Sequence, residues 1–527
     1  MRSLGRGAAG IIAGRVRVLK NDAIDTTADS WPCARQGAQS RCGAMVTVFA
    51  VSLGAAIVTR WYGLFPSVIV DWDESLYAVI ADGWLNGLLP YRDIWDHHPP
   101  GLPALFAAIL DVFPDSIVAI RVSACVAVAA TATALFFMAR ATIGGAAAPP
   151  IAAALYLAWT ARLWGLVANT EVYINALMAP AMYILVRQLI APTRRQLASL
   201  CLGALLVGIA LQIKHVALTE TALFLGLALW CRSKAAPKDL LRSAAALAAS
   251  FLAPSLLVLA YFQWHGLAGE YLASVVTANL TYIGDRANLA HVVATLPRTL
   301  FLPIALVPIA ALVMKLRSDR ANRILLAWGL AACVDVVLPG QYWLHYFLLA
   351  MPAAALLAAY LAAVALARRT TAMRVAVAAA VFVAAYPIGI YKDAAIARAF
   401  GEDDVPQAIA DAIRDEGAPG AYIFVLNYQP IIYLLADAKL PNRHVFPGDW
   451  TERFSGTSGV DPVQEVDKIF AKKPAFVVFI DKDWNDIGAE AFAAFKAHLD
   501  GYEKDLEFID RQMLPEPVPI EVYRRKA

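Results

Sequence analysis

Charged residues are scarce in this chain of 527 residues. Asp, Glu, Lys and Arg together make up 17% of it, whereas apolar residues make up 60%, and the mean hydropathy is +0.57. A soluble globule of this length would need more polar side chains to cover its surface. The composition therefore excludes a soluble protein and predicts an integral membrane protein.

Cysteine is also rare, which bears on disulfides and metal sites. None of the cysteines lies in the C-terminal tail or in a long outer loop, so no disulfide framework is expected, and no Cys-His spacing indicates zinc. The tail has no Gly-rich phosphate loop, which argues against a nucleotide site there. No internal repeat is evident. The six cysteines are Cys33, Cys42, Cys125, Cys201, Cys231 and Cys333.

Long apolar runs recur from Ala44 to about Ile390 and then stop. A helix needs roughly 17–25 apolar residues to cross about 30 Å of hydrocarbon. The runs predict about eleven spans. These are residues 44–65, 117–139, 148–166, 172–190, 197–216, 218–231, 240–262, 299–314, 324–339, 345–366 and 374–391.

The orientation of the spans follows from Lys and Arg, because basic flanks of short loops resist translocation. These residues gather at alternate span ends, which predicts a cytoplasmic face there. Residues 1–43 are basic and lack a small-residue cleavage pattern, so they are expected to be a cytoplasmic tail and not a signal peptide. An odd number of crossings then places the 71–102 loop and the tail after Tyr391 outside, in the periplasm of a bacterium.

Residues 44–391 are predicted to form a transmembrane domain. The sequence pattern of the tail, residues 392–527, predicts a small α/β domain after it. Helices are expected in "DVPQAIADAIRDEG", "PIIYLLADA", "VDPVQEVDKIFAKK" and "GAEAFAAFKAHLDG". Strands are expected in "AYIFVL" and "PAFVVFID", and "IEVYRR" is expected to close the sheet as an edge strand.

Ionisable side chains away from the cytoplasmic face map to the outer end of the bundle, in five separate loops. At membrane depth such a group costs at least about 2.5–3.5 kcal/mol unless it lines a wet cavity. Their convergence predicts a catalytic cavity that opens outward, although outer loops are also polar simply because they meet water. The clusters are Asp71, Asp73, Glu74, Arg92, Asp93, Asp96, His97 and His98; Arg162 and Glu171; Lys214, His215 and Glu220; Asp285 and Arg286; and Gln341, Tyr342, His345 and Tyr346.

The first outer loop has the pattern of two short interfacial helices. Apolar residues recur at helical spacing over 74–85, and a second apolar helix is expected over 101–113, too short to span. Asp73 and Glu74 stand at the start of the first helix, where the positive helix end favours ionised carboxylates. For Asp73 an N-cap role is the structural alternative. Two lone histidines, as in "HHPP", more often form hydrogen bonds than ligate a metal.

This loop, "DWDESLYAVIADGWLNGLLPYRDIWDHHPPGL", resembles that of the GT-C glycosyltransferases related to protein O-mannosyltransferases and to the aminoarabinose and galacturonic acid transferases of lipid A. Those enzymes show an Asp-Glu pair with a Tyr three residues on, here Asp73, Glu74 and Tyr77. A Lys-Pro-Pro turn follows, here His98 and Pro99–Pro100. "NTEVYINAL", "GIALQIKHVAL" and "QYWLHYFLLAMP" also match, and the likeness covers roughly 44–391.

The resemblance implies an inverting transferase that moves a sugar from a polyprenyl-phosphate donor to an acceptor hydroxyl at the outer membrane boundary. Asp73 with Glu74 would be catalytic, with Asp73 as the base. The departing phosphate would be held by His98, Arg92 and Lys214. This chain has His98 where those enzymes have the Lys of the turn. The difference matters because a histidine is positively charged only when it is protonated. The expected cavity residues are Tyr77, Asp96, His97, Glu171, His215, Tyr342 and His345.

No cofactor is expected, since base and cap roles account for the acids and a metal has no support from the sequence. The expected partners are the bilayer, the lipid-linked donor and an envelope acceptor, which is lipid A or lipopolysaccharide, a cell-surface glycan or a protein. Nucleic acid is not a partner. A flippase or transporter, and a polymerase or ligase of lipid-linked saccharides, are the alternatives. A transporter would show ionisable residues at mid-membrane depth and a repeat, and Asp335 is the one acid well inside a predicted span.

Overall fold

The computed structural model describes residues 36–65, 72–161, 165–284, 320–366, 404–416, 420–450, 455–481, 488–510 and 517–526. Apart from the start of the first helix, these residues belong to one compact unit, Phe49–Ala527. Several predicted features lie outside the described residues. They are the spans 299–314 and 374–391, Asp71, Arg162, Asp285, Arg286 and most of the N-terminal tail.

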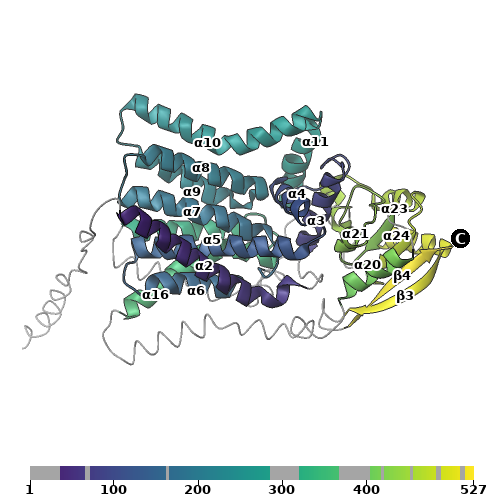
Figure 1. The fold of residues 1–527 in the computed structure, drawn as a ribbon. Coiled ribbons are helices and arrows are strands. Elements are labelled where there is room, and N and C mark those ends of the chain that lie inside the picture. Colours follow the sequence, from purple (N-terminus) through teal and green to yellow (C-terminus); the bar gives the residue numbers. More distant parts are fainter. Residues whose placement is uncertain are drawn as a thin grey trace, which may run out of the picture. The chain divides into compact units, whose positions relative to one another are not determined.

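The region before residue 367 is almost entirely helical where it is described. Helices α5 to α10 lie side by side, and the two short helices α3 and α4 lie at one end of this group (Figure 1). The long elements are α2 (Gln36–Leu64), α5 (Ile117–Thr142), α6 (Ala148–Thr160), α7 (Thr170–Ile190), α8 (Gln196–Ile213), α9 (Leu218–Cys231), α10 (Pro237–Trp264), α15 (Arg320–Val337) and α16 (Met351–Leu366). The short elements between them are η1 (His215–Ala217), α11 (Ala268–Leu272), η2 (Ala273–Ala278), α12 (Asn279–Gly284) and η3 (Leu344–Ala350).

Six helices among the described residues are long and apolar enough to cross a membrane. They correspond to the predicted spans 44–65, 117–139, 172–190, 197–216, 240–262 and 345–366. The predicted spans 148–166, 218–231 and 324–339 are the helices α6, α9 and α15, which fall short of the same test of length and apolarity. The helical, multi-pass membrane architecture is therefore confirmed, while the number of crossings stays a prediction.

The two interfacial helices predicted in the first outer loop are present. They are α3 (Trp72–Leu85) and α4 (Gly101–Val112). Helix α4 buries Leu102, Phe106 and Leu110 at helical spacing, which explains why this short segment is held against the bundle. The loop between α3 and α4 is therefore anchored by a helix at each end.

The C-terminal region forms a four-stranded sheet with strand order β1-β2-β4-β3. Strand β1 (Ile423–Leu426) pairs in parallel with β2 (Phe476–Phe479), and both are buried. Strand β4 (Val518–Arg525) pairs antiparallel with β2 and with β3 (Tyr502–Asp510). The helices of this region are α20 (Val405–Asp415), α21 (Ile431–Leu435), α22 (Ser455–Ser458), α23 (Pro462–Ala471) and α24 (Ala489–His498), with the 3-10 turns η4 (Pro447–Trp450) and η5 (Leu499–Gly501).

This confirms a small α/β domain, but the position predicted for "IEVYRR" is wrong. That segment lies in β4, which is an inner strand, and the edge strands are β1 and β3. Strand β3, "YEKDLEFID", was not predicted because its charged side chains hide the apolar alternation. Most of its residues are at least partly exposed, as an edge strand allows.

The C-terminal domain contacts the first outer loop at Trp95. The Trp95 backbone N–H donates to the Arg443 carbonyl at 2.8 Å, and the Trp95 ring lies 5.3 Å from that of His444, centroid to centroid. The contact falls one residue before Asp96, so this domain supports the loop that carries the histidine pair.

Candidate functional site

Asp73 lies in the first turn of α3, which begins at Trp72, and not at the capping position before the helix. Its side chain is 28% exposed. The Lys214 Nζ lies 3.9 Å from its Oδ2, and the His345 Nε2 lies 4.0 Å from the same atom. Two basic side chains and a helix N-terminus thus surround a carboxylate that solvent can still reach.

Glu74, the neighbour of Asp73, has a different environment. It is 1% exposed, and the Arg121 Nε donates to its Oε1 at 2.8 Å. The backbone N–H of Ala168 donates to its Oε2, and Arg121 also donates to the Gly63 carbonyl at 2.7 Å. Glu74 was predicted to be catalytic together with Asp73. A catalytic role for Glu74 stays a prediction. In the structure it joins α3 to α5 and to the segment before α7, and we propose that it positions α3.

Lys214 follows the last residue of α8 and connects two carboxylates. Its side chain is 5% exposed, and its Nζ lies 3.3 Å from the Glu171 Oε1 as well as 3.9 Å from the Asp73 Oδ2. It also donates to the Thr170 hydroxyl at 3.4 Å and lies 4.7 Å from the centroid of the Tyr346 ring. Lys214 is thus a buried ammonium whose charge is compensated by the two carboxylates.

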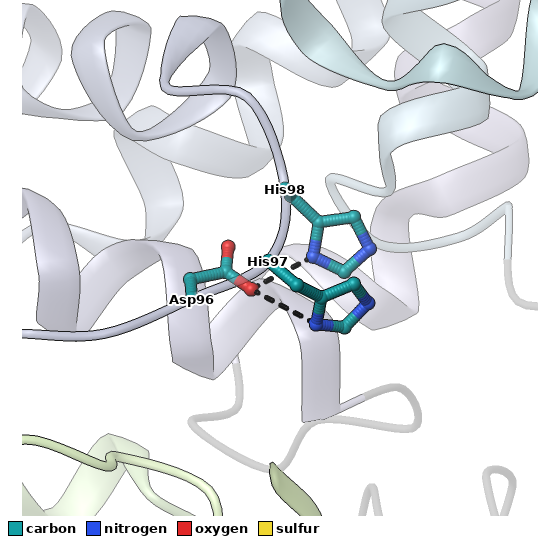
Figure 2. A group of neighbouring side chains, drawn as sticks. All are labelled: Asp96, His97 and His98. Atoms are coloured by element: carbon teal, nitrogen blue, oxygen red, sulfur yellow. Dashed lines mark hydrogen bonds and ion pairs between the residues drawn. The ribbon is translucent and has the colours of Figure 1, made fainter. Parts of the chain in front are cut away.

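Asp96, His97 and His98 point toward one another from a single bend (Figure 2). The Asp96 Oδ1 lies 2.9 Å from the His98 Nδ1 and 3.6 Å from the His97 Nδ1. The two imidazole rings are 4.0 Å apart, centroid to centroid. The backbone of the bend is fixed by the Tyr91 hydroxyl, which donates to the His98 carbonyl at 2.9 Å, and by the Asn279 amide, which donates to the His97 carbonyl.

The surroundings of this bend shift two pKa values. Burial disfavours ionisation of Asp96, but His98 and then His97 outweigh it and lower the pKa of Asp96 to about 2. Burial, with a contribution from His98, lowers the pKa of His97 to about 3. At neutral pH Asp96 is therefore ionised and His97 is neutral.

The histidine bend and the Lys214 cluster meet at the same end of the bundle. A side chain at Gly101 would collide with the Gln212 carbonyl, two residues before Lys214. This glycine therefore lets the start of α4 approach the end of α8. The Tyr77 ring, one helical turn after Asp73, packs edge-on against the His98 ring with centroids 5.7 Å apart.

Tyr282 of α12 also borders both groups. Its ring lies 5.1 Å from that of His97. Burial raises the pKa of Tyr282, and the charges of Lys214 and Asp73 are close enough to affect it. Residues from five predicted outer segments are thus brought together.

Three residues that were predicted for the site lie less favourably for contact with the donor. Arg92 has a side chain that is 53% exposed and pairs with Asp93 at 2.8 Å. No ion pair or hydrogen bond joins it to the Lys214 cluster within the described part of the chain. His215 is exposed, and Tyr342 is half-buried with a φ of 55°. Their roles stay predictions.

Sequence reasoning missed Arg121. A signal was available, because an arginine near the outer end of the span 117–139 breaks the rule that places basic residues at cytoplasmic ends. Such a residue needs a buried partner, which the structure identifies as Glu74.

Asp335, the acid inside a predicted span, has a structural partner. Its carboxylate accepts the backbone N–H groups of Thr219 at 2.7 Å and Glu220 at 2.9 Å. It therefore satisfies the free N–H groups at the start of α9. This placement gives no support to an ion pathway through the membrane.

The chain is similar to known proteins in its structure but not detectably in its sequence. No family model matches the sequence, and no curated protein matches it either. Solved structures do. The crystal structure of ArnT from Cupriavidus metallidurans bound to undecaprenyl phosphate aligns with a TM-score of 0.59 at 16% identity, covering 91% of this chain and 98% of that chain. The apo form aligns with a TM-score of 0.60 at 14% identity, covering 92% and 98%.

The chain has the fold of ArnT. The alignment extends over nearly all of both chains, which includes the helical bundle and the C-terminal domain. It confirms the GT-C fold that the first outer loop predicted. At 14% and 16% identity the ArnT likeness establishes fold, so chemistry has to be argued from the residues of this chain.

Proposed function

We propose that this chain is an integral-membrane inverting glycosyltransferase, which moves a sugar from a polyprenyl-phosphate donor to an acceptor hydroxyl. The observation that carries the proposal is the partly exposed carboxylate of Asp73 beside Lys214 and His345, on the side of the bundle that holds His98. The ArnT fold supports it, since an ArnT structure holds undecaprenyl phosphate.

In the proposed reaction the acceptor oxygen attacks the anomeric carbon of the donor sugar. The bond from that carbon to the phosphate oxygen breaks, and the lipid phosphate leaves with the bonding electrons. Asp73 accepts the proton of the attacking hydroxyl, which is typically worth about 10²–10⁴-fold in rate. Attack opposite the leaving group inverts the configuration. Asp73 suits this role because basic groups lie beside it and its side chain remains accessible.

The leaving phosphate carries negative charge that the site must stabilise. Lys214 supplies a fixed positive charge, and Glu171 holds its ammonium in place at 3.3 Å. His98 lies at the same end of the bundle and is proposed to contact the phosphate. His345, 4.0 Å from Asp73, is proposed to help position the acceptor or the sugar.

The proposed location is the bacterial inner membrane, with the site and the C-terminal domain in the periplasm. This orientation is supported by the distribution of Lys and Arg along the sequence. The proposed boundaries are a cytoplasmic tail to residue 43, a catalytic membrane domain over 44–391 and a periplasmic domain over 392–527. The acceptor class is lipid A or lipopolysaccharide, a surface glycan or a protein.

The test compares envelope glycans and glycolipids, by mass spectrometry, from cells with and without the protein. One missing sugar, together with accumulation of its polyprenyl-phosphate donor, is expected in the deleted strain. Restoration by the wild-type chain but not by Asp73→Asn supports the assignment. An unchanged set of glycans and lipid-linked sugars in the deleted strain would contradict it.

A further inference from the structure

The bend at residues 96–98 contains buried polar atoms whose hydrogen-bonding capacity is unused. The Asp96 Oδ2 and the His97 Nδ1 are buried and form no hydrogen bond within the described part of the chain. Buried polar atoms are normally satisfied, so each exception needs an explanation. Here the two atoms belong to adjacent residues. The His97 Nδ1 points toward the Asp96 Oδ1, whereas the Asp96 Oδ2 lies on the other side of the same carboxylate (Figure 2).

We propose that Asp96, His97 and His98 bind one divalent cation of the Zn²⁺ class. One carboxylate oxygen and one ring nitrogen from each histidine lie within 4.8 Å of one another. Two imidazoles and a carboxylate form a ligand set that zinc commonly uses where a fourth position is left open.

The observed separations fit such a site. With metal–ligand bonds of about 2.0–2.1 Å, tetrahedral geometry requires ligand atoms about 3.3–3.4 Å apart. The Asp96 Oδ1 is 2.9 Å from the His98 Nδ1 and 3.6 Å from the His97 Nδ1, so these two distances bracket this value. A bound cation would replace the hydrogen bond between the Asp96 Oδ1 and the His98 Nδ1.

The backbone holds the three side chains on one side. Three consecutive residues of a strand would point alternately to opposite faces, whereas His97 and His98 lie in a bend. The hydrogen bonds to the carbonyls of both histidines fix that bend, and the following Pro99–Pro100 restricts its backbone. The ligand set is therefore largely preformed.

The cation would also supply a charge that this loop lacks. No Lys or Arg occurs from Asp93 to Pro103, although the proposed phosphate site includes His98. A cation with an open coordination position binds a phosphate oxygen and neutralises its developing charge. This role in the reaction rests on the proposed function, whereas the cation site itself rests on the bend alone.

Metal binding is measured first, on the purified full-length protein in detergent. The metal-stripped chain is titrated with Zn²⁺ against a chromophoric chelator, and bound zinc is counted by mass spectrometry. About one Zn²⁺ per chain is expected, and Asp96→Asn and His97→Ala are expected to weaken binding at least about 100-fold. His265→Ala, which changes an exposed histidine outside the bend, is the matched control and should bind like the wild type.

Two outcomes overturn the site. One is a wild-type chain that takes up no stoichiometric zinc, and the other is equal binding by the wild type and both ligand variants. Loss of binding counts only for variants that elute as folded protein with an unchanged circular dichroism spectrum. Because the wild-type titration needs no variant, the proposal can fail even if both variants are unstable.

A second arm separates the cation site from the proposed function. Retention of undecaprenyl phosphate is measured with and without chelator, for the wild type and for His98→Lys. The chelator should weaken retention by the wild type but not by His98→Lys, since a lysine replaces the lost charge. If zinc binds but the chelator changes retention by neither chain, the cation site stands and its contact with phosphate is wrong.

Discussion

The buried ion pair between Glu74 and Arg121 gives a prediction that distinguishes a role of Glu74 in protein stability from a role in catalysis. Both side chains are 1% exposed and their charged atoms are 2.8 Å apart. Removing one member of a buried pair leaves an uncompensated charge, which costs about 3–5 kcal/mol. Glu74→Gln should therefore lower the free energy of unfolding by several kcal/mol, although glutamine preserves the shape of the side chain.

The assay is thermal unfolding of the purified protein in detergent, followed by tryptophan fluorescence. A double variant, Glu74→Gln with Arg121→Met, removes both charges and should recover much of the lost stability. At a temperature where Glu74→Gln remains folded, it should still transfer sugar at a measurable rate. A Glu74→Gln chain that melts like the wild type yet transfers nothing would refute the positioning role and make Glu74 catalytic.

Three further predictions concern the phosphate contacts and pH. His98→Lys should keep substantial transfer activity and His98→Ala should lose most of it; equal, near-wild-type rates for both would remove His98 from the phosphate site. Lys214→Met should weaken retention of undecaprenyl phosphate about tenfold to hundredfold, as expected for a lost hydrogen bond to a charged group, whereas unchanged retention would exclude a phosphate contact. Burial, followed by the negative charges of Asp115 and Asp437, raises the pKa of Asp82 to about 6. The folded state therefore favours protonated Asp82, and the free energy of unfolding falls as the pH rises through that value. Asp82→Asn should therefore gain about 1 kcal/mol over the wild type at pH 8, allowing for partial exposure, and melting curves that differ equally at pH 4 and pH 8 would contradict this.

Much of the architecture could be predicted because hydrophobic length and periodicity report directly on helices. The interfacial helices α3 and α4 followed from apolar spacing and from their insufficient length for a span. The grouping of Asp73, Lys214 and His345 followed from the outer-end position of each in the sequence, since all three had to lie at one face of the bundle.

Other features depend on backbone conformation or on distant partners, which local patterns do not contain. The approach of Asp96 to both histidines requires the bend at 97–98. In an extended segment with the same residues these side chains would point to opposite faces. The pairing of Glu74 with Arg121 joins residues 47 positions apart. Strand β3 escaped prediction because its exposed face is charged.

The role of Asp73 is tested most directly by comparing Asp73→Asn with Asp111→Asn, which changes an exposed carboxylate in the same outer loop. Both variants and the wild type are expressed at equal levels in the deleted strain, and the initial rate of sugar addition to the envelope acceptor is followed by mass spectrometry. Asp73→Asn should be about 10²–10⁴-fold slower, with retention of undecaprenyl phosphate preserved, while Asp111→Asn should match the wild type. Transfer by Asp73→Asn within a few-fold of the wild-type rate would contradict the assignment of this carboxylate as the base.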